Sequence, residues 1–184
     1  MRDTFEGIER IKVLVKRVLD FTKTGTPAFS SGDIHEAIND ALELIAPQIK
    51  KKNIEVKKDF AEKMGPLVFD PHQMQQVFVN LLLNATESTP EGGVIEIRSA
   101  MEKSRNRGND IQVITITDNG QGISPDNMPK IFDPFFTTKP EGTGLGLSIV
   151  HKILEQHEAS IDIKSKESTG SSFSLRFPAK RSSN

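Results

Sequence analysis

The residues best suited to chemistry stand between Asp118 and Val150, where the chain reads DNGQGISPDNMPKIFDPFFTTKPEGTGLGLSIV. Two groups of glycines lie in this stretch, one behind an aspartate and one before an apolar helical pattern: Gly120 and Gly122, then Gly142, Gly144 and Gly146. Glycine lets the backbone approach a ligand closely and adopt positive φ angles. A helix start adds free N–H groups and the positive end of the helix dipole. The stretch therefore predicts a site for a phosphate-bearing ligand.

Two common phosphate-binding sequences do not account for these glycines. The GTGLG segment lacks the third glycine of a dinucleotide fingerprint, because Leu147 stands three residues after Gly144. It also follows a loop rather than a strand, which is the wrong context for that fingerprint. No Gly-Lys-Ser or Gly-Lys-Thr is present, which excludes a P-loop.

Polar residues beside apolar segments are candidate ligands for the rest of such a molecule. Asp118 ends an apolar segment, where it is either a turn residue or an acceptor for an exocyclic amine at the mouth of a pocket. Asn80 and Asn84 stand four residues apart in an apolar helical pattern, so they face the same way. They are either satisfied core amides or carbonyl-oxygen ligands for Mg²⁺, a hard cation.

The composition limits the possible classes of function. The 184 residues suit one domain with a short extra element. Lys and Arg number 24 against 25 Asp and Glu, and this balance argues against a dedicated nucleic-acid binder. Without cysteine the chain can have neither disulfides nor thiolate metal sites. No apolar run approaches the roughly 20 residues that cross a bilayer, which predicts a cytoplasmic fragment without membrane contact and leaves open a membrane anchor in a longer parent protein.

An amphipathic helix is predicted over residues 4–24. Its apolar positions alternate by three and four, at Ile8, Ile11, Val15, Val18 and Thr22. This is the spacing of a coiled-coil seam, which favours packing against a helix outside this chain. The alternative is a helix docked on its own domain.

Helices and strands alternate through the rest of the chain and predict one α+β fold. Residues 25–32 are predicted to be a linker, and Pro47 is expected to kink the next helix or break its last turn. The periodicities predict helices between Asp33 and Asn53 and over 71–88 and 145–157, with strands over 54–60, 66–69, 94–101, 111–117, 161–163 and 173–177. We expect a two-layer α/β sandwich, in which helices cover one face of a mixed sheet, plus the N-terminal helix.

Four segments in the order NLLLNATES, DNGQGI, FDPFFTTK and GTGLGLSIV resemble the catalytic ATP-binding domain of bacterial sensor histidine kinases. That domain belongs to the superfamily of gyrase, Hsp90, histidine kinases and MutL, which shares the Bergerat fold. The first helix resembles the end of the second helix of the dimerisation and phosphoacceptor domain. The resemblance thus implies three parts, with residues 1–26 as the end of that helix, 27–180 as the ATP-binding domain and 181–184 as a loose tail.

The resemblance implies ATP and Mg²⁺ as ligands and assigns roles by position. Asn84 corresponds to the Mg²⁺ ligand, and Asn80 to the asparagine one turn earlier that faces the phosphates. Asp118 corresponds to the acceptor for the adenine amino group, and Lys139 to a lid cation that contacts phosphate. Asn80, Asn84 and Lys139 are thereby the expected catalytic residues. Further nucleotide contacts are expected at Glu87, Gly120, Gly122, Ile123, Gly142, Thr143, Gly144, Leu145, Gly146 and Ser172, with Ser171 beside it, and Phe132, Phe135 and Phe136 are expected to pack the base of the lid.

The resemblance also implies a kinase rather than a hydrolase. Hydrolytic members of the superfamily carry a glutamate, the general base for water, where this chain has Asn80, so the γ-phosphate is expected to pass to a histidine. Among the four histidines, His35 begins an H-E-x-x-N sequence typical of phosphoacceptors but lacks the proline that usually follows. The acceptor is therefore expected outside this chain.

The partners that follow are the protein's own upstream phosphoacceptor helix, in a homodimer of the full-length protein, and a response regulator receiver domain. No nucleic acid is expected. Two alternatives stay open. One is a nucleotide-binding regulatory module without kinase activity. The other is an anti-sigma-type Ser/Thr kinase from the same superfamily, against which the helix over residues 4–24 argues.

Overall fold

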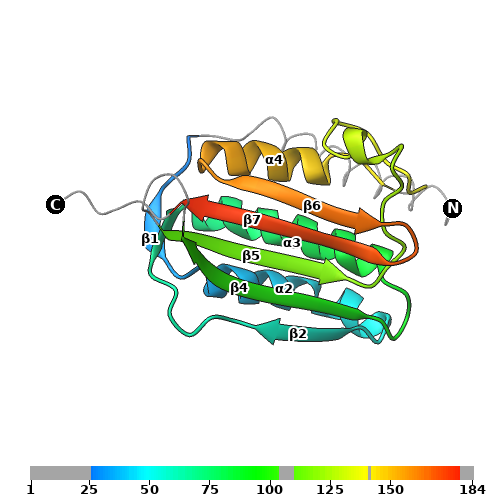
Figure 1. Ribbon diagram of the computed structural model, residues 1–184, viewed down its shortest axis with the longest axis horizontal. Coiled ribbons are helices and arrows are strands. Elements are labelled where there is room, and N and C mark those ends of the chain that lie inside the picture. Colours follow the sequence, from blue (N-terminus) through cyan, green and yellow to red (C-terminus); the bar gives the residue numbers. More distant parts are fainter. Residues whose placement is uncertain (1–25, 104–109, 141, 179–184) are drawn as a thin grey trace, which may run out of the picture.

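The computed structural model describes residues 26–103, 110–140 and 142–178, and within them three helices cover one face of a five-stranded sheet (Figure 1). The elements are β1 Ser30–Gly32, α2 Ile34–Lys51, β2 Glu55–Asp59, β3 Leu67–Phe69, α3 Pro71–Ser88, β4 Val94–Lys103, β5 Asp110–Asp118, the 3-10 turn η1 Met128–Lys130, α4 Gly146–Gln156, β6 Ser160–Lys166 and β7 Gly170–Pro178. The strand order is β2-β4-β5-β7-β6, with β2 parallel to β4 and the other neighbours antiparallel.

This architecture confirms the predicted two-layer sandwich with a mixed sheet, and β5 lies at its centre as its apolar sequence indicates. The predicted helix over residues 4–24 and the tail over 181–184 lie outside the described residues. The division of the chain near residue 26 therefore stays a prediction. In the described part, no helix combines the length and the apolar character that a membrane crossing requires.

The core lies between the helices and the sheet. Alternate side chains of each strand point into it. Ile114 and Ile116 of β5 point toward the helices and are almost completely buried. Thr115 and Thr117 point to the opposite face, where their hydroxyls lie 3.1 Å from Ser174 Oγ and 2.9 Å from Ser172 Oγ. The sheet thus has one apolar face and one polar face.

Helix α3 lies between α2 and α4 and packs against both (Figure 1). It begins where Asp70 and Pro71 predict, because the Asp70 carboxylate accepts the N–H groups of His72 and Gln73. Its buried face is the predicted one: Met74, Val77, Phe78, Leu81, Leu82 and Ala85. The opposite end of this helix reaches the glycine-rich segments.

Two sequence expectations are wrong in detail. The predicted linker contains β1, which pairs with β3 in an antiparallel two-stranded sheet. The sequence Ser-Ser-Gly has no apolar alternation, so only its pairing partner makes it a strand. Helix α2 also continues past Pro47 to Lys51, so its last turn is not broken, whereas the kink stays a prediction. Asn53, two residues after the end of the helix, has a left-handed φ angle of 51°.

Replacing Asp70 by alanine is expected to lower the free energy of unfolding by about 2 kcal/mol, because it removes a helix N-cap and a further acceptor. Besides its two helix contacts, the carboxylate accepts the N–H of Ala28 at 2.8 Å. The matched control is Asp33→Ala, since Asp33 caps α2 through one contact, to His35 N, and it should cost about 1 kcal/mol or less. Chemical denaturation measures both values, and equal losses would contradict the role given to the Ala28 contact.

The contribution of Asp70 to the free energy of unfolding should also depend on pH. Burial alone would raise the pKa of Asp70, but hydrogen bonds from Gln73, Ala28 and His72 and the nearby His157 lower it below the usual 3.8. A lowered pKa in the folded state means that the stabilisation is present above pH 3.8 and is lost as the pH falls through the folded-state value. The difference between wild type and Asp70→Ala should therefore shrink in acid.

Candidate functional site

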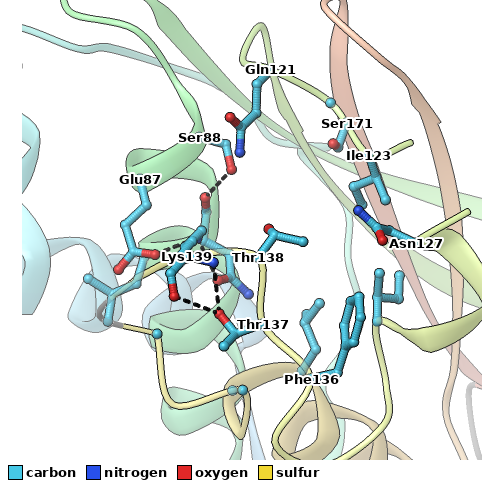
Figure 2. Close-up of a pocket in the computed structure, with 18 of the residues that line it drawn as sticks. Glu87, Ser88, Gln121, Ile123, Asn127, Phe136, Thr137, Thr138, Lys139 and Ser171 are labelled. Carbon is cyan, nitrogen blue, oxygen red and sulfur yellow. Dashed lines mark hydrogen bonds and ion pairs between the residues drawn. The ribbon is translucent and has the colours of Figure 1, made fainter. Parts of the chain in front are cut away.

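A cavity of about 830 Å³ opens between the end of α3, the loop after β5, the segment before α4 and the turn between β6 and β7. We call residues 132–140 and 142–145 the lid segment. Figure 2 shows Ile123, Asn127 and Ser171 on one side of the cavity, with Glu87 and Lys139 on the opposite side. The cavity brings together eleven of the residues expected at the site: Asn80, Asn84, Glu87, Asp118, Gly122, Ile123, Lys139, Gly142, Thr143, Gly144 and Gly146.

Three of the expected residues lie outside the cavity lining. Gly120 lies behind it, where its N–H donates to Asp118 Oδ1 at 2.9 Å. Leu145 is fully buried in the core below the start of α4. Ser172 was expected to contact the nucleotide, but its side chain points to the polar face of the sheet and its hydroxyl pairs with Thr117. Its neighbour Ser171 lines the cavity instead, as the two-residue period of a strand requires.

Asp118 is a buried carboxylate at the end of β5, with 4% of its surface exposed. Burial raises its pKa above the usual 3.8, and hydrogen bonds from the backbone of Gly120 and Ser171 and the charge of Lys139 oppose that rise. A desolvated carboxylate that lines a cavity is a strong acceptor for a ligand N–H. This geometry suits the amine of a heterocyclic base.

Gly122 brings the loop after β5 against the turn between β6 and β7. Its φ angle is +69°, and a Cβ atom there would lie 2.1 Å from the Lys166 carbonyl oxygen. Ile123 N donates to Ser165 Oγ at 2.8 Å, which fixes the next residue of the same loop. The loop is thus held close beside Asp118 by contacts that leave no room for a side chain.

The last two turns of α3 present oxygen ligands to the other end of the cavity. Asn80, Asn84 and Glu87 follow one another at helical spacing and all line the cavity. Lys139 Nζ, from the lid segment, donates to Asn84 Oδ1 at 3.3 Å and forms an ion pair with Glu87 Oε2. One cation thus already sits where two oxygens converge, and oxygen ligands are those that Mg²⁺ prefers. The donor set fits such an ion with Asn84 and Glu87 as its protein ligands.

The backbone that carries Glu87 is held by Lys52. Its ammonium donates to the carbonyl oxygens of Thr86, Glu87 and Thr89, each at 2.9 Å. These are among the carbonyls at the end of α3 that have no partner within the helix. Lys52 therefore caps α3 and fixes the turn from which Glu87 reaches the cavity.

The lid segment joins this end of the cavity to α4. Phe136 lines the cavity, and the Phe132 ring lies 5.1 Å from the His151 ring. Phe135 was expected to pack the lid base, but 64% of its surface is exposed, and the base is closed instead by the hydrogen bond from its N–H to the Gly144 carbonyl. Leu145 stands at the N-cap of α4 and offers no side-chain cap, so the first turn keeps N–H groups for an anion beside the cavity.

Sequence reasoning missed several lining residues, among them Gln121, Asn127 and Thr138. Thr138 could have been inferred from its place next to Lys139, whereas Asn127 follows no period that would mark it. His35 lies away from the cavity lining: its ring stacks on Phe60 with centroids 4.3 Å apart, and its Nε2 lies 2.9 Å from Ser99 Oγ. In the part of the chain that the structure describes, no three His, Asp or Glu residues form a metal cluster.

Curated proteins that are similar to this chain in sequence are named as kinases. The chain is 35% identical over 170 residues to the sensor histidine kinase ZraS of Escherichia coli (strain K12), a match that covers 92% of this chain and 35% of that protein. It is 32% identical over 180 residues to sporulation kinase C of Bacillus subtilis (strain 168), covering 97% of this chain and 41% of the relative. The chain thus spans well under half the length of these curated relatives.

Solved structures share the fold as well. The catalytic domain of histidine kinase ThkA superposes with a TM-score of 0.70 at 33% identity, covering 82% of this chain and 95% of that domain. A structure of ThkA in complex with the response regulator protein TrrA matches at 28% identity with a TM-score of 0.75, over 96% of this chain and 49% of that one. A family model matches residues 69–181, which hold α3, the cavity and all later strands. The chain therefore belongs to the family described as histidine kinase-, DNA gyrase B-, and HSP90-like ATPase.

Proposed function

We propose that this chain binds ATP with Mg²⁺ and is the catalytic domain of a sensor histidine kinase, passing the γ-phosphate to a histidine outside the chain. The observation that carries the proposal is one cavity lined both by the buried carboxylate of Asp118 and by the oxygens of Asn84 and Glu87 that hold a cation. Asp118 accepts the adenine amine. Asn84 is the metal ligand, with Glu87 beside it, and the start of α4 and Lys139 neutralise the phosphates.

Phosphoryl transfer needs mainly positioning and charge neutralisation, and this cavity offers both. Mg²⁺ neutralises charge on the phosphates when it is bound. Asn80 lies against the start of α4, since a Cβ on Gly146 would lie 3.3 Å from its Oδ1. An amide is a poor base, so Asn80 orients ligands without activating water, and the ATP is kept for the acceptor histidine.

The partners belong to the same proposal. The related ThkA has been solved with a response regulator at 28% identity to this chain, and an equivalent regulator would receive the phosphate here. The acceptor histidine lies in a phosphoacceptor helix that precedes this domain in a homodimeric parent. His35 is a poor acceptor because its ring is stacked on Phe60 and mostly buried.

The isolated chain is expected to bind an ATP analogue in the presence of Mg²⁺ and to incorporate no phosphate by itself. Calorimetric titration measures the binding, and Asn84→Ala should weaken the Mg²⁺-dependent part by roughly tenfold or more. Addition of the phosphoacceptor domain of the parent kinase, with labelled ATP, should give acid-labile phosphohistidine on that domain. A chain that binds no nucleotide would refute the proposal.

The form of the product separates the alternatives. Acid-stable phosphate on serine or threonine would indicate the anti-sigma-type kinase, and binding without any transfer would indicate a regulatory module. Acid-labile phosphate on the isolated chain would make His35 the acceptor. The intact cation site and lid glycines favour transfer to the added domain.

A further inference from the structure

Lys139 of the lid segment contacts α3 at the oxygen that the proposed function assigns to Mg²⁺. Lys139 approaches α3 from the lid, 52 residues further along the chain than Glu87, and pairs with that carboxylate (Figure 2). The same ammonium donates to Asn84 Oδ1. The Lys139 and Glu87 side chains keep 30% and 51% of their surface exposed, so a ligand entering the cavity can reach both.

This contact conflicts with metal binding. Under the proposed function, Asn84 Oδ1 is a ligand for Mg²⁺, and a divalent cation there repels an ammonium in contact with the same oxygen. The Glu87 carboxylate attracts either cation. The lysine and the metal therefore compete for one pair of oxygens, and the lysine must leave Asn84 when the metal arrives.

We propose that Glu87 holds Lys139 on the metal-binding oxygen of Asn84, so that the lid lysine is released toward the phosphates only when Mg²⁺ arrives with the nucleotide. This inference rests on the proposed function and deepens it. Without the metal Glu87 positions Lys139, and with the metal bound it is a ligand beside Asn84. Its consequence is that nucleotide affinity depends more strongly on the metal than it would without the pair.

Charge explains the direction of this dependence. Metal-free ATP meets a carboxylate that repels it and a lysine whose charge is already neutralised by that carboxylate. ATP that carries Mg²⁺ brings a cation able to take over the oxygens of both Glu87 and Asn84, which frees Lys139 for the phosphates. Removing the carboxylate and removing the lysine should therefore have opposite effects.

The quantity to measure is the ratio of the ATP dissociation constant in EDTA to that in Mg²⁺, by calorimetry on the whole chain. In Glu87→Gln the ratio should fall by about three- to tenfold, because metal-free ATP gains a free lysine and loses a repelling charge. In Lys139→Met it should rise by about the same factor, because metal-free ATP meets an unpaired carboxylate and Mg²⁺ no longer has to displace the ammonium, and these two effects outweigh the phosphate contact that is lost in Mg²⁺. The double variant should lie between the two.

Two controls separate this pair from general charge effects. Glu91→Gln and Lys164→Met make the same charge changes at exposed positions outside the cavity lining, and they should leave the ratio within about twofold of wild type. Glu87→Asp, which keeps the charge but shortens the side chain, should shift the ratio partway toward that of Glu87→Gln. Melting curves establish that each variant is folded.

The outcomes distinguish the inference from the function on which it rests. Opposite shifts in the two single variants support the proposed exchange. Shifts in the same direction, or shifts no larger than those of the controls, overturn it while leaving ATP binding intact. Failure of the wild-type chain to bind ATP with Mg²⁺ would instead refute the proposed function.

Discussion

Asparagine in place of Asp118 is expected to weaken ATP binding by about a hundredfold or more, through a lost charge-assisted hydrogen bond and a donor placed against a donor. The asparagine oxygen can still accept the Gly120 N–H, which now bonds to Asp118 Oδ1 at 2.9 Å. Its NH₂ group then takes the place of the carboxylate oxygen and faces the adenine amine. Calorimetric titration of Asp118→Asn with ATP and Mg²⁺ measures the loss.

The same substitution is expected to stabilise the folded protein at neutral pH. Burial raises the pKa of Asp118, so the folded state holds a proton more readily than the unfolded state, whose value is about 3.8. The stability of wild type relative to the variant therefore falls as the pH rises from 3.8 through the folded-state pKa, and it is constant above that pKa. Asp118→Asn should melt at a higher temperature at pH 7, and the two proteins should converge in acid.

The control for both effects is Asp126→Asn, which removes an exposed carboxylate from the loop before η1. It should change neither the ATP affinity nor the melting temperature. Wild-type affinity in Asp118→Asn would show that Asp118 does not contact the base. A lower melting temperature in that variant would show that the hydrogen bonds of the carboxylate outweigh the cost of its burial.

Features of the fold that depend on neighbouring residues could be predicted from the sequence. The start of α3 is determined by Asp70 and Pro71, and its buried face by a helical period of apolar residues. The alternation of Phe173, Leu175 and Phe177 determines which face of β7 is apolar. Applied two residues earlier, the same alternation selects Ser171 over Ser172, whereas the resemblance pointed to both.

Features that depend on distant partners could not be predicted. Strand β1 exists because it pairs with β3, and Ala28 before it is held by a carboxylate 42 residues later. The ion pair between Lys139 and Glu87 joins residues 52 positions apart. Neither contact leaves a periodic signal, because each depends on how the elements pack in three dimensions.

Both ends of the cavity depend on the last turn of α3. Lys52 binds three carbonyls there and so fixes the turn that carries Glu87. The Ser88 carbonyl accepts the N–H of Gln121 at 3.2 Å, which holds the loop after Asp118 against the same turn. The end of α3 therefore holds both the turn that carries Glu87 and the loop after Asp118, while residues of the lid segment also line the cavity.

Alanine in place of Gly144 is expected to slow phosphoryl transfer by about a hundredfold, because it displaces the lid from the phosphates. Gly144 has a φ angle of +67°, and a Cβ atom there would lie 2.3 Å from the carbonyl carbon of Phe135. The Phe135 N–H donates to the Gly144 carbonyl at 2.9 Å, so the two ends of the lid segment cross at this contact. Because the clash is between backbone atoms, no side-chain rotation can relieve it. The contact between Phe135 and Gly144 must therefore separate.

Gly92→Ala is the matched control for this substitution. Gly92 has a φ angle of +71°, but no heavy atom lies within 4 Å of the position of an added Cβ. It should carry the same dihedral strain, about 1 kcal/mol of stability, and leave ATP binding and transfer unchanged. If Gly144→Ala and Gly92→Ala lost the same stability and both kept full transfer, the crossing at Phe135 would have no part in holding the lid. Slow transfer in Gly144→Ala alone, with the melting transition largely kept, would place the effect in the lid rather than in the core.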